Sequence, residues 1–218
     1  MITYEQIKVK KPNIKDHSVH NSCTGWVGVY KEARLTYVRK HNLGRSVSQG
    51  MFSMVYNHPT RKRRIVKIGY IKSGVRGSNA YLEYAKEILS YQGNPFFPKI
   101  YSLKIIQGHV SRDCPDYVED LLYVVEMERL RHNTLLRDDD NDFLFKSYAQ
   151  TVGAVNRQVE VLRKKFQSIG VDIPSERIDH LKQVYMVLGK MSAHHYFDMH
   201  DHNVMYRGKQ VVITDPVS

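Results

Sequence analysis

The last part of the chain, residues 196–218, limits the possible folds more than any other stretch. Asp198 and Asn203 stand five residues apart, the apolar triplet Val211-Val212-Ile213 follows a polar turn, and Asp215 closes the run. Two carboxylates and an amide can converge on one site when a tight loop returns through a hairpin. The pattern predicts a catalytic loop, a β-hairpin and a metal-binding aspartate, although polar loop residues before an edge hairpin are an alternative interpretation.

A second candidate metal site consists of His194, His195, His200 and His202. Imidazole side chains favour zinc or nickel. No cysteine and no strict ligand spacing accompany these histidines, so a closed zinc site is the weaker of the two interpretations.

The chain has 218 residues and a formal net charge of +11 at pH 7. We expect one domain or one two-lobed unit that meets phosphate-rich or acidic partners. Two cysteines make no disulfide framework, and neither a signal peptide nor an apolar run of roughly 20 residues is apparent. These features predict a soluble protein of the cytoplasm. Direct nucleic-acid binding is not expected, because the aromatic residues are not interleaved with basic ones in any recognised motif.

Two basic stretches lie in the first third of the chain. Residues 1–40 are expected to form an N-terminal extension with a Lys-rich start, and residues 30–39 have the apolar spacing of a short helix. The run Arg61-Lys62-Arg63-Arg64 is expected to be a solvated hairpin tip. For both stretches, contact with a partner is the alternative.

From residue 47 the pattern changes to strands and turns. Residues 47–56 and 65–70 are β-branched and aromatic segments around a polar, proline-containing connection, which predicts a hairpin. Lys67 lies inside the second segment, where strand alternation places Val66 and Ile68 on one face and the lysine on the other. A lysine on a half-buried strand needs a partner; a surface lysine is the alternative.

An amphipathic helix is predicted over residues 79–91. Glu83 and Glu87 lie one turn apart on it, and either could reach Lys67 or be a surface acid. Glu87 lies nearer to the expected distance before Pro95 and is the candidate for this pairing.

The rest of the chain predicts two strands and then helices. The strands are expected at residues 96–101 and 121–125. One helix is expected from Phe143 to about residue 167, after an acidic cluster at residues 138–142. Another is expected from Pro174 or Ser175, and its predicted buried stripe consists of Ile178, Leu181, Val184, Tyr185, Leu188 and Met191.

In this order, the hairpin, lysine, helix glutamate, D-x-x-x-x-N loop and final aspartate resemble the protein-kinase-like superfamily over residues 43–218. Five segments resemble, more specifically, the early serine/threonine kinase of T-seven-like bacteriophages. They are Gly50-x-Phe52-Ser53, Val66-Lys67-Ile68-Gly69, Tyr91-Gln92-Gly93, Phe197-Asp198-Met199-His200 with Asn203, and Ile213-Thr214-Asp215-Pro216-Val217-Ser218.

The resemblance implies an α+β, two-lobed protein-kinase-like fold. Residues 41–130 would form a β-rich N-lobe with the hinge. Residues 131–218 would form a minimal helical C-lobe that lacks the activation segment and the later helices.

ATP and Mg²⁺ are the cofactors that the resemblance implies. The residues expected to contact the nucleotide are Gly50, Phe52, Ser53 and Val55 of the glycine-rich loop, Lys67 with Glu87, and the hinge segment with Glu126 and Glu128. Asp198 would orient the attacking hydroxyl, and His200 would steady the γ-phosphate. Asn203 and Asp215 would bind Mg²⁺.

Members of this family phosphorylate host proteins, among them components of the transcription and RNA-processing machinery, and help shut off host gene expression. The resemblance therefore implies phosphorylation of Ser or Thr in host bacterial proteins, in the host cytoplasm. Tyr196-Phe197 and Pro216-Val217 depart from the His-Arg and Phe-Gly of larger kinases. Two alternatives remain open: a kinase-shaped module that inhibits a host protein by occupancy, and a small-molecule phosphotransferase, whose loops read D-x-H-x-x-N as residues 198–203 do.

Overall fold

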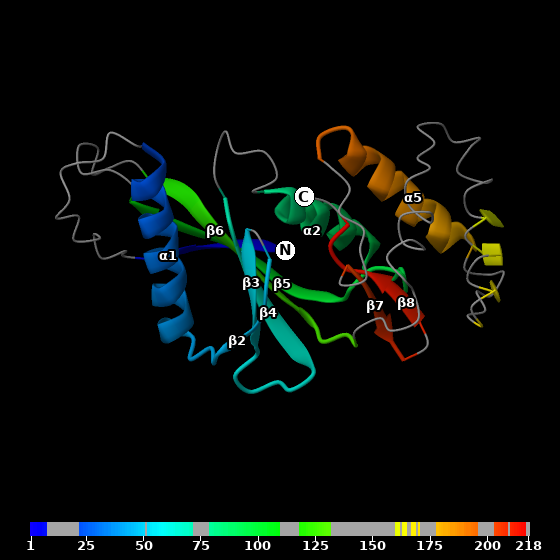
Figure 1. The fold of residues 1–218 in the computed structure, drawn as a ribbon, viewed down its shortest axis with the longest axis horizontal. Helices are drawn as coiled ribbons and strands as arrows, with labels where there is room; N and C mark the ends of the chain where they lie inside the picture. The colour runs from blue at the N-terminus through cyan, green and yellow to red at the C-terminus, as the bar shows by residue number, and fades with distance from the viewer. Residues whose placement is uncertain are drawn as a thin grey trace. The chain divides into compact units, whose positions relative to one another are not determined.

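The chain forms an α+β fold that divides into two compact units (Figure 1). The first unit contains residues 1–79 and 100–129, and the second contains residues 80–99 and 130–218. The computed structural model describes residues 1–7, 22–50, 52–71, 79–109, 118–131, 160–161, 163–164, 167–168, 170, 178–195, 203–208 and 210–216. Within these ranges, every helix is too short or too polar to cross a bilayer.

A mixed six-stranded sheet organises the first unit, in the order β1-β5-β6-β4-β3-β2. β1 pairs with β5 in parallel, and the other neighbouring strands are antiparallel. The strands are β1 (Ile2–Gln6), β2 (Ser46–Gln49), β3 (Ser53–Asn57), β4 (Arg64–Tyr70), β5 (Ile100–His109) and β6 (Val118–Glu128). The hairpin predicted around the basic run is formed by β3 and β4.

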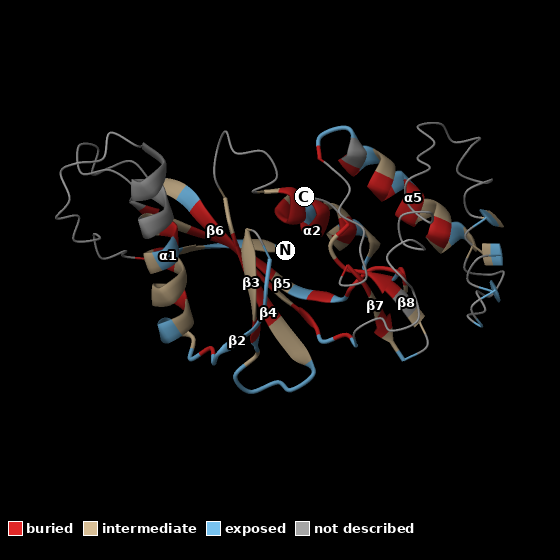
Figure 2. Ribbon diagram, in the orientation of Figure 1, coloured by how far each residue is buried: buried red, intermediate tan, exposed pale blue. Residues whose placement is uncertain are grey.

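Helix α1 (Ser22–Lys40) packs against this sheet and is longer than the helix predicted at residues 30–39. Tyr30, Ala33 and Tyr37 lie on one side of it and are buried in a cluster with sheet residues. The sheet residues of this cluster are Tyr56, Val66, Ile68, Ile106, Leu121, Leu122 and Val124, and Figure 2 shows the buried positions in red. Because Val66 and Ile68 both join the cluster, strand alternation directs Lys67 to the opposite face.

The N-terminal segment, predicted as an extension, contributes β1 to the edge of the sheet. Ile7 continues the pairing, since its amide donates to the carbonyl of Gln107 at 3.0 Å. The Glu5 carboxylate lies 2.6 Å from the Lys40 amine, 3.2 Å from the His41 ring and 3.4 Å from the Lys104 amine. These contacts fasten β1 to the end of α1 and to β5.

The second unit contains helices and a hairpin. Its elements are α2 (Ala80–Ile88), the 3₁₀-helix η1 (Leu89–Tyr91), α5 (Ile178–Ser192), β7 (Val204–Arg207) and β8 (Gln210–Ile213). Gly208 turns the chain between β7 and β8 with a φ of 63°, which suits a residue without Cβ. The predicted stripe of α5 is buried from Leu181 to Met191, whereas Ile178 is half-buried.

Most of one predicted helix and the predicted start of another fall outside the described residues. The acidic cluster at 138–142 and the helix start predicted at Pro174 or Ser175 lie there, as does most of the helix predicted from Phe143. The described residues 160–161, 163–164 and 167–168 are helical. Gly170, with a φ of 76°, donates its amide to the Gln167 carbonyl at 3.0 Å, close to the helix end predicted at about residue 167.

The strand predicted at residues 96–101 begins only at Ile100, so that prediction is wrong for its first four residues. Asn94 starts a turn instead: its side-chain oxygen accepts from the Phe96 amide at 2.9 Å, and its carbonyl accepts from the Phe97 amide at 3.3 Å. Pro98 then has no amide proton for a strand ladder. Apolar character at these positions reflects burial in a turn.

Gly69 permits a close contact inside the sheet. It lies opposite Tyr123 in the β4–β6 register, and a Cβ at this glycine would stand 2.0 Å from Cζ of that tyrosine. Tyr123 is almost completely buried, so its ring has little room to move. The ring therefore packs directly on the backbone of β4, two residues from Lys67.

We predict that Gly69→Ala lowers the free energy of unfolding by about 1–3 kcal/mol or more, because the new methyl group overlaps the Tyr123 ring. Urea unfolding followed by circular dichroism measures this change. Gly44→Ala is the matched control, since a Cβ there meets nothing within 4 Å. Equal losses in both variants would contradict the packing argument.

Asn94 also joins the turn before β5 to α5. Its amide nitrogen donates to the His180 carbonyl at 2.7 Å and to the Gln183 side chain at 3.0 Å. The side chain is buried, so these groups are shielded from water.

We predict that Asn94→Ala destabilises the protein by about 1–3 kcal/mol, because buried polar groups lose their hydrogen-bond partner. Asn94→Asp should also be less stable than the wild type, since it keeps the acceptor for the Phe96 amide but turns a carboxylate oxygen toward the His180 carbonyl. Thermal unfolding of both variants beside Gln49→Ala, a change on the exposed strand β2, checks this prediction. An Asn94→Ala midpoint equal to that of the control would refute it.

Candidate active site

The predicted site residues fall in both units. Those in the first unit are Gly50, Phe52, Ser53, Val55, Lys67, Glu126 and Glu128, and those in the second are Glu83, Glu87, Asn203 and Asp215. Asp198 and His200 lie outside the described residues. The structure brings the residues together within each unit as follows.

The candidate glycine-rich loop is a tight turn between β2 and β3. The Gly50 amide donates to the Ser53 carbonyl at 2.9 Å, and the Phe52 carbonyl accepts from the Tyr70 amide at 3.1 Å. Gly50 is exposed, whereas Phe52, Ser53 and Val55 are partly buried. A Cβ at Gly50 would lie 3.4 Å from the Ser53 hydroxyl, so the turn leaves little space around this glycine.

Lys67 lies near the middle of β4, with Val55 of β3 on one side and Val125 of β6 on the other. The residue is only 7% exposed. Lysine is seldom buried unless it is paired, because removing an ammonium group from water is costly. This burial, on a strand between two others, excludes the alternative of an ordinary surface lysine.

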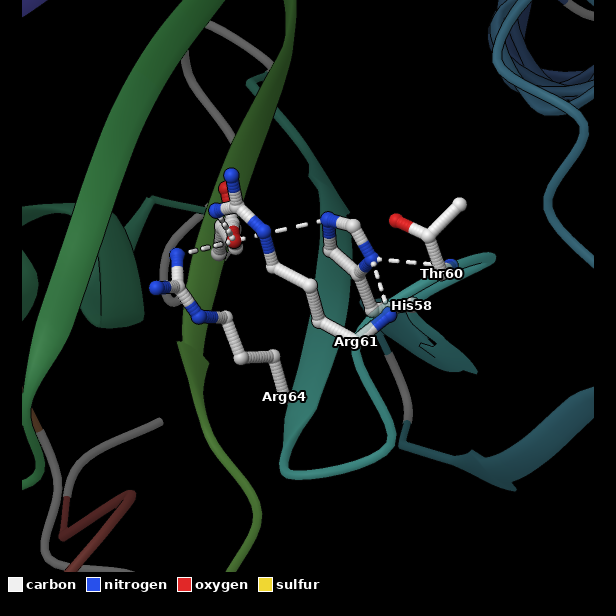
Figure 3. Close-up of polar contacts among 5 residues, drawn as sticks. His58, Thr60, Arg61 and Arg64 are labelled. Atoms are coloured by element: carbon white, nitrogen blue, oxygen red, sulfur yellow. Dashed lines mark hydrogen bonds and ion pairs between the residues drawn. The ribbon is translucent and has the colours of Figure 1, made fainter.

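The Glu126 carboxylate is held by side chains of the β3–β4 turn (Figure 3). Its Oε1 atom lies 2.6 Å from the Arg64 guanidinium, 3.2 Å from that of Arg61 and 3.4 Å from the His58 ring. Burial alone would raise the pKa of Glu126, but the Arg64 hydrogen bond and the surrounding charges outweigh it and lower the pKa. Its side chain thus anchors this turn.

Glu128 lies at the end of β6, opposite Arg64, and is buried. The nucleotide contact implied for the hinge segment with Glu126 and Glu128 would come from backbone groups, so the side-chain contacts of Glu126 leave it a prediction.

The β7–β8 hairpin brings Asn203 and Asp215 to the same end of one ladder. Val204 pairs with Ile213 at this end of the ladder. Asn203 comes directly before Val204, and Thr214 comes directly after Ile213. Thr214 donates both its amide, at 2.8 Å, and its hydroxyl, at 3.0 Å, to the Asn203 carbonyl. Asp215 follows Thr214 directly, so the backbones of Asn203 and Asp215 lie at the same end of the hairpin, and the convergence of their side chains stays a prediction.

Helix α2 holds β8 through a buried tyrosine. The Tyr84 hydroxyl donates to the Ile213 carbonyl at 2.7 Å. From the other direction, the Ile213 amide donates to the Phe96 carbonyl at 2.8 Å. The strand before Asp215 is therefore fixed on both of its backbone groups.

The charge of Asp215 is felt by two tyrosines of α2. Burial first, and then the Asp215 charge, raises the pKa of Tyr81 far above its ordinary value. Burial, Tyr81 and Asp215 have the same effect on the pKa of Tyr84. Both phenols stay neutral, and the Oδ1 atom of Asp215 is itself buried.

The two candidate glutamates of α2 have different partners, one near the end of α5 and one just after it. The Glu83 carboxylate lies 2.6 Å from Nε2 of His195, whose side chain is buried, and the Glu87 carboxylate lies 2.5 Å from the Lys190 amine. The hydrogen bond from Lys190 and the charge of Glu87 raise the pKa of that lysine. Neither contact tests the predicted pairing of a glutamate with Lys67.

A Mg²⁺ ion prefers oxygen ligands, and Asn203 and Asp215 supply an amide and a carboxylate from one end of the hairpin. Their chemistry fits the expected ion. Of the histidine alternative, His195 faces Glu83, and His200 and His202 lie outside the described residues. Among the residues that the structure describes, no group of three or more His, Cys, Asp or Glu side chains could hold a metal ion.

Some site-forming residues carry no recognisable signal in the sequence. Thr214 and Tyr84 act through backbone carbonyls, and their roles depend on contacts across 11 and 129 residues of chain. The position of Thr214 between a predicted strand and Asp215 is the one local clue.

A family model described as bacteriophage T7 protein kinase 0.7 matches residues 35–218. No curated protein matches the chain. The matched range includes the candidate glycine-rich turn, the buried Lys67 and the β7–β8 hairpin, which confirms the resemblance stated from the sequence. The chain belongs to the bacteriophage T7 protein kinase 0.7 family.

Proposed function

We propose that this protein transfers the γ-phosphate of ATP to Ser or Thr side chains of host bacterial proteins. Membership of a protein kinase family indicates the kinase activity. The observation that carries the proposal is the hairpin that puts Asn203 and Asp215 at the same end of a ladder, closed by Thr214. The two units would correspond to the lobes of a protein-kinase-like fold.

Asn203 and Asp215 would hold Mg²⁺. When bound, this ion would neutralise negative charge on the phosphates of ATP. The burial of the Asp215 Oδ1 atom suits this role, because a carboxylate in a weakly screened setting attracts a cation more strongly than one in water.

Other residues would position the nucleotide and the acceptor. Lys67, buried on β4, would pair with the α- and β-phosphates, and the turn at Gly50 would cover the phosphates with backbone amides. Asp198 would orient the attacking hydroxyl and His200 would steady the γ-phosphate. Positioning and charge neutralisation would together supply most of the rate enhancement.

The acceptors would be host proteins, among them parts of the transcription and RNA-processing machinery, and their phosphorylation in the host cytoplasm would contribute to shutoff of host gene expression. This part of the proposal is supported by the family resemblance and by the net charge of +11, which favours encounters with acidic surfaces.

We predict that Asp215→Asn and Lys67→Met each lower phosphate transfer by at least about 100-fold, because each removes a charge that would hold or neutralise the triphosphate. Labelled ATP and Mg²⁺ with a bacterial lysate measure the transfer, and mapping of the labelled sites shows whether they are Ser or Thr. Asp179→Asn is the matched control, since this acid lies on the exposed side of α5 and pairs only at the surface with Lys182.

Three results would contradict the proposal. Full activity of Asp215→Asn would show that the hairpin is not part of the active site. Label in small hydroxylated acceptors and in no protein would favour a small-molecule phosphotransferase. An inactive Asp198→Asn variant that still shuts off host gene expression would favour inhibition by occupancy.

A further inference from the structure

The turn between β3 and β4 carries four consecutive cations, Arg61-Lys62-Arg63-Arg64, which we name the basic turn. Arg61, Lys62 and Arg63 are exposed, and Arg64 is partly buried. The proposed phosphate transfer assigns no role to these residues. Four adjacent positive charges repel one another, so a turn that holds them together must be stabilised by other contacts.

Glu126 supplies the support at the base of the basic turn. Arg64 and Arg61 both bind its Oε1 atom, and Figure 3 shows their guanidinium groups directed to the same carboxylate. Arg64 also lies over the Tyr101 ring, 3.6 Å from its centre. Two of the four cations are therefore used to fix the turn.

His58 fixes the backbone of the same turn. Its Nδ1 atom accepts hydrogen bonds from the amides of Thr60, at 3.2 Å, and Arg61, at 3.1 Å. A nitrogen that accepts carries no proton, so the ring proton lies on Nε2, the atom that faces Glu126. The side chain thus bridges the backbone of the turn and its anchoring carboxylate.

Two further backbone hydrogen bonds close the turn. The Arg64 amide donates to the Arg61 carbonyl at 2.9 Å, and the Arg129 amide donates to the Arg63 carbonyl at 2.8 Å. Arg129 follows β6, and its guanidinium binds the Asn57 side chain at the end of β3. Arg129, which is exposed, is therefore a third fixed cation, and its backbone lies next to Arg63.

Lys62 and Arg63 occupy that apex and differ from their neighbours. Neither side chain makes a hydrogen bond or an ion pair with any residue that the structure describes. The arrangement keeps two cations available on a support that is already ordered. A preorganised site loses less conformational entropy when it binds, so its contacts contribute more to affinity.

We propose that the basic turn, through Lys62 and Arg63 with Arg129 beside them, is a docking site for an acidic segment of the protein substrate. The inference rests on the proposed function, because it assigns the substrate class to a protein kinase. Carboxylates of Asp or Glu match exposed Lys and Arg groups in charge and in hydrogen bonding.

A protein partner fits the basic turn better than a nucleic acid does. Single-stranded nucleic acids are bound by a basic groove together with aromatic rings on which bases stack. Tyr101, the exposed aromatic residue beside the turn, already has the Arg64 guanidinium over one face of its ring. The available groups at the apex are charges without a stacking platform.

The first test measures binding. We predict that a fluorescein-labelled oligoglutamate peptide binds the wild-type chain, and that Lys62→Glu with Arg63→Glu weakens this binding about tenfold or more. Lys31→Glu with Arg45→Glu is the matched control, because it makes the same charge change at exposed positions of α1 and the segment before β2. Fluorescence anisotropy gives the affinities, and circular dichroism verifies that each variant folds.

The second test measures kinetics with a serine peptide that carries either a glutamate tail or a glutamine tail. The charge-reversed double variant should raise KM for the glutamate-tailed peptide and leave its kcat unchanged, while the glutamine-tailed peptide is phosphorylated as by the wild type. Lys62→Ala with Arg63→Ala should shift KM in the same direction by a smaller factor.

The two tests separate failure of the docking site from failure of the proposed function. An oligoglutamate affinity that is equal in the wild type, the apex variant and the control variant would overturn the docking site, whatever the kinase assay shows. Tighter binding of an RNA of equal charge, lost in the apex variant, would overturn the protein partner. A wild-type protein that binds oligoglutamate but transfers no phosphate would overturn the kinase proposal alone.

Discussion

The two hydrogen bonds from Thr214 to the Asn203 carbonyl are the constraint on which the candidate active site depends. They close the end of the β7–β8 ladder, so that Asn203 and Asp215 lie at the same end of the hairpin. Both donors are buried with their acceptor, which makes the bonds costly to break. The hairpin would otherwise fray at the end where it is needed.

Buried hydrogen bonds also fix the position of β8. Tyr84 holds the Ile213 carbonyl and Phe96 holds its amide, which leaves the strand no backbone freedom immediately before Asp215. In the first unit, Gly69 and Tyr123 give β4 and β6 a close contact beside Lys67. In both units, a candidate ligand thus lies in or next to a segment that buried neighbours hold in place. Lys67, a candidate phosphate ligand, lies in β4, and Asp215, a candidate metal ligand, follows β8.

The hairpin and the α5 stripe could be predicted because they depend on local patterns. Val211-Val212-Ile213 after a glycine turn favours a strand, and the apolar positions between Leu181 and Met191 repeat with helical spacing. The buried Lys67 was foreseeable for a related reason, since alternation between two apolar neighbours directs it to the other face of the sheet.

The remaining features depend on partners distant in the chain. β1 has the polar sequence Ile-Thr-Tyr-Glu-Gln and becomes a strand by pairing with β5, about a hundred residues later. The start of β5 was misplaced because the Asn94 turn buries Phe96 and Phe97 outside the sheet. The choice between Glu83 and Glu87 could not be made from spacing, since long side chains one turn apart can reach different partners, here His195 and Lys190.

The most direct test of the account is the binding of Mn²⁺, a spectroscopic substitute for Mg²⁺, in the presence of a non-hydrolysable ATP analogue. Electron paramagnetic resonance distinguishes free from bound Mn²⁺ in the wild type, in Asn203→Ala and in Asp215→Asn. The account predicts nucleotide-dependent binding to the wild type that is strongly weakened in both variants. Binding of equal strength in all three proteins would contradict the assignment of this hairpin as the metal site.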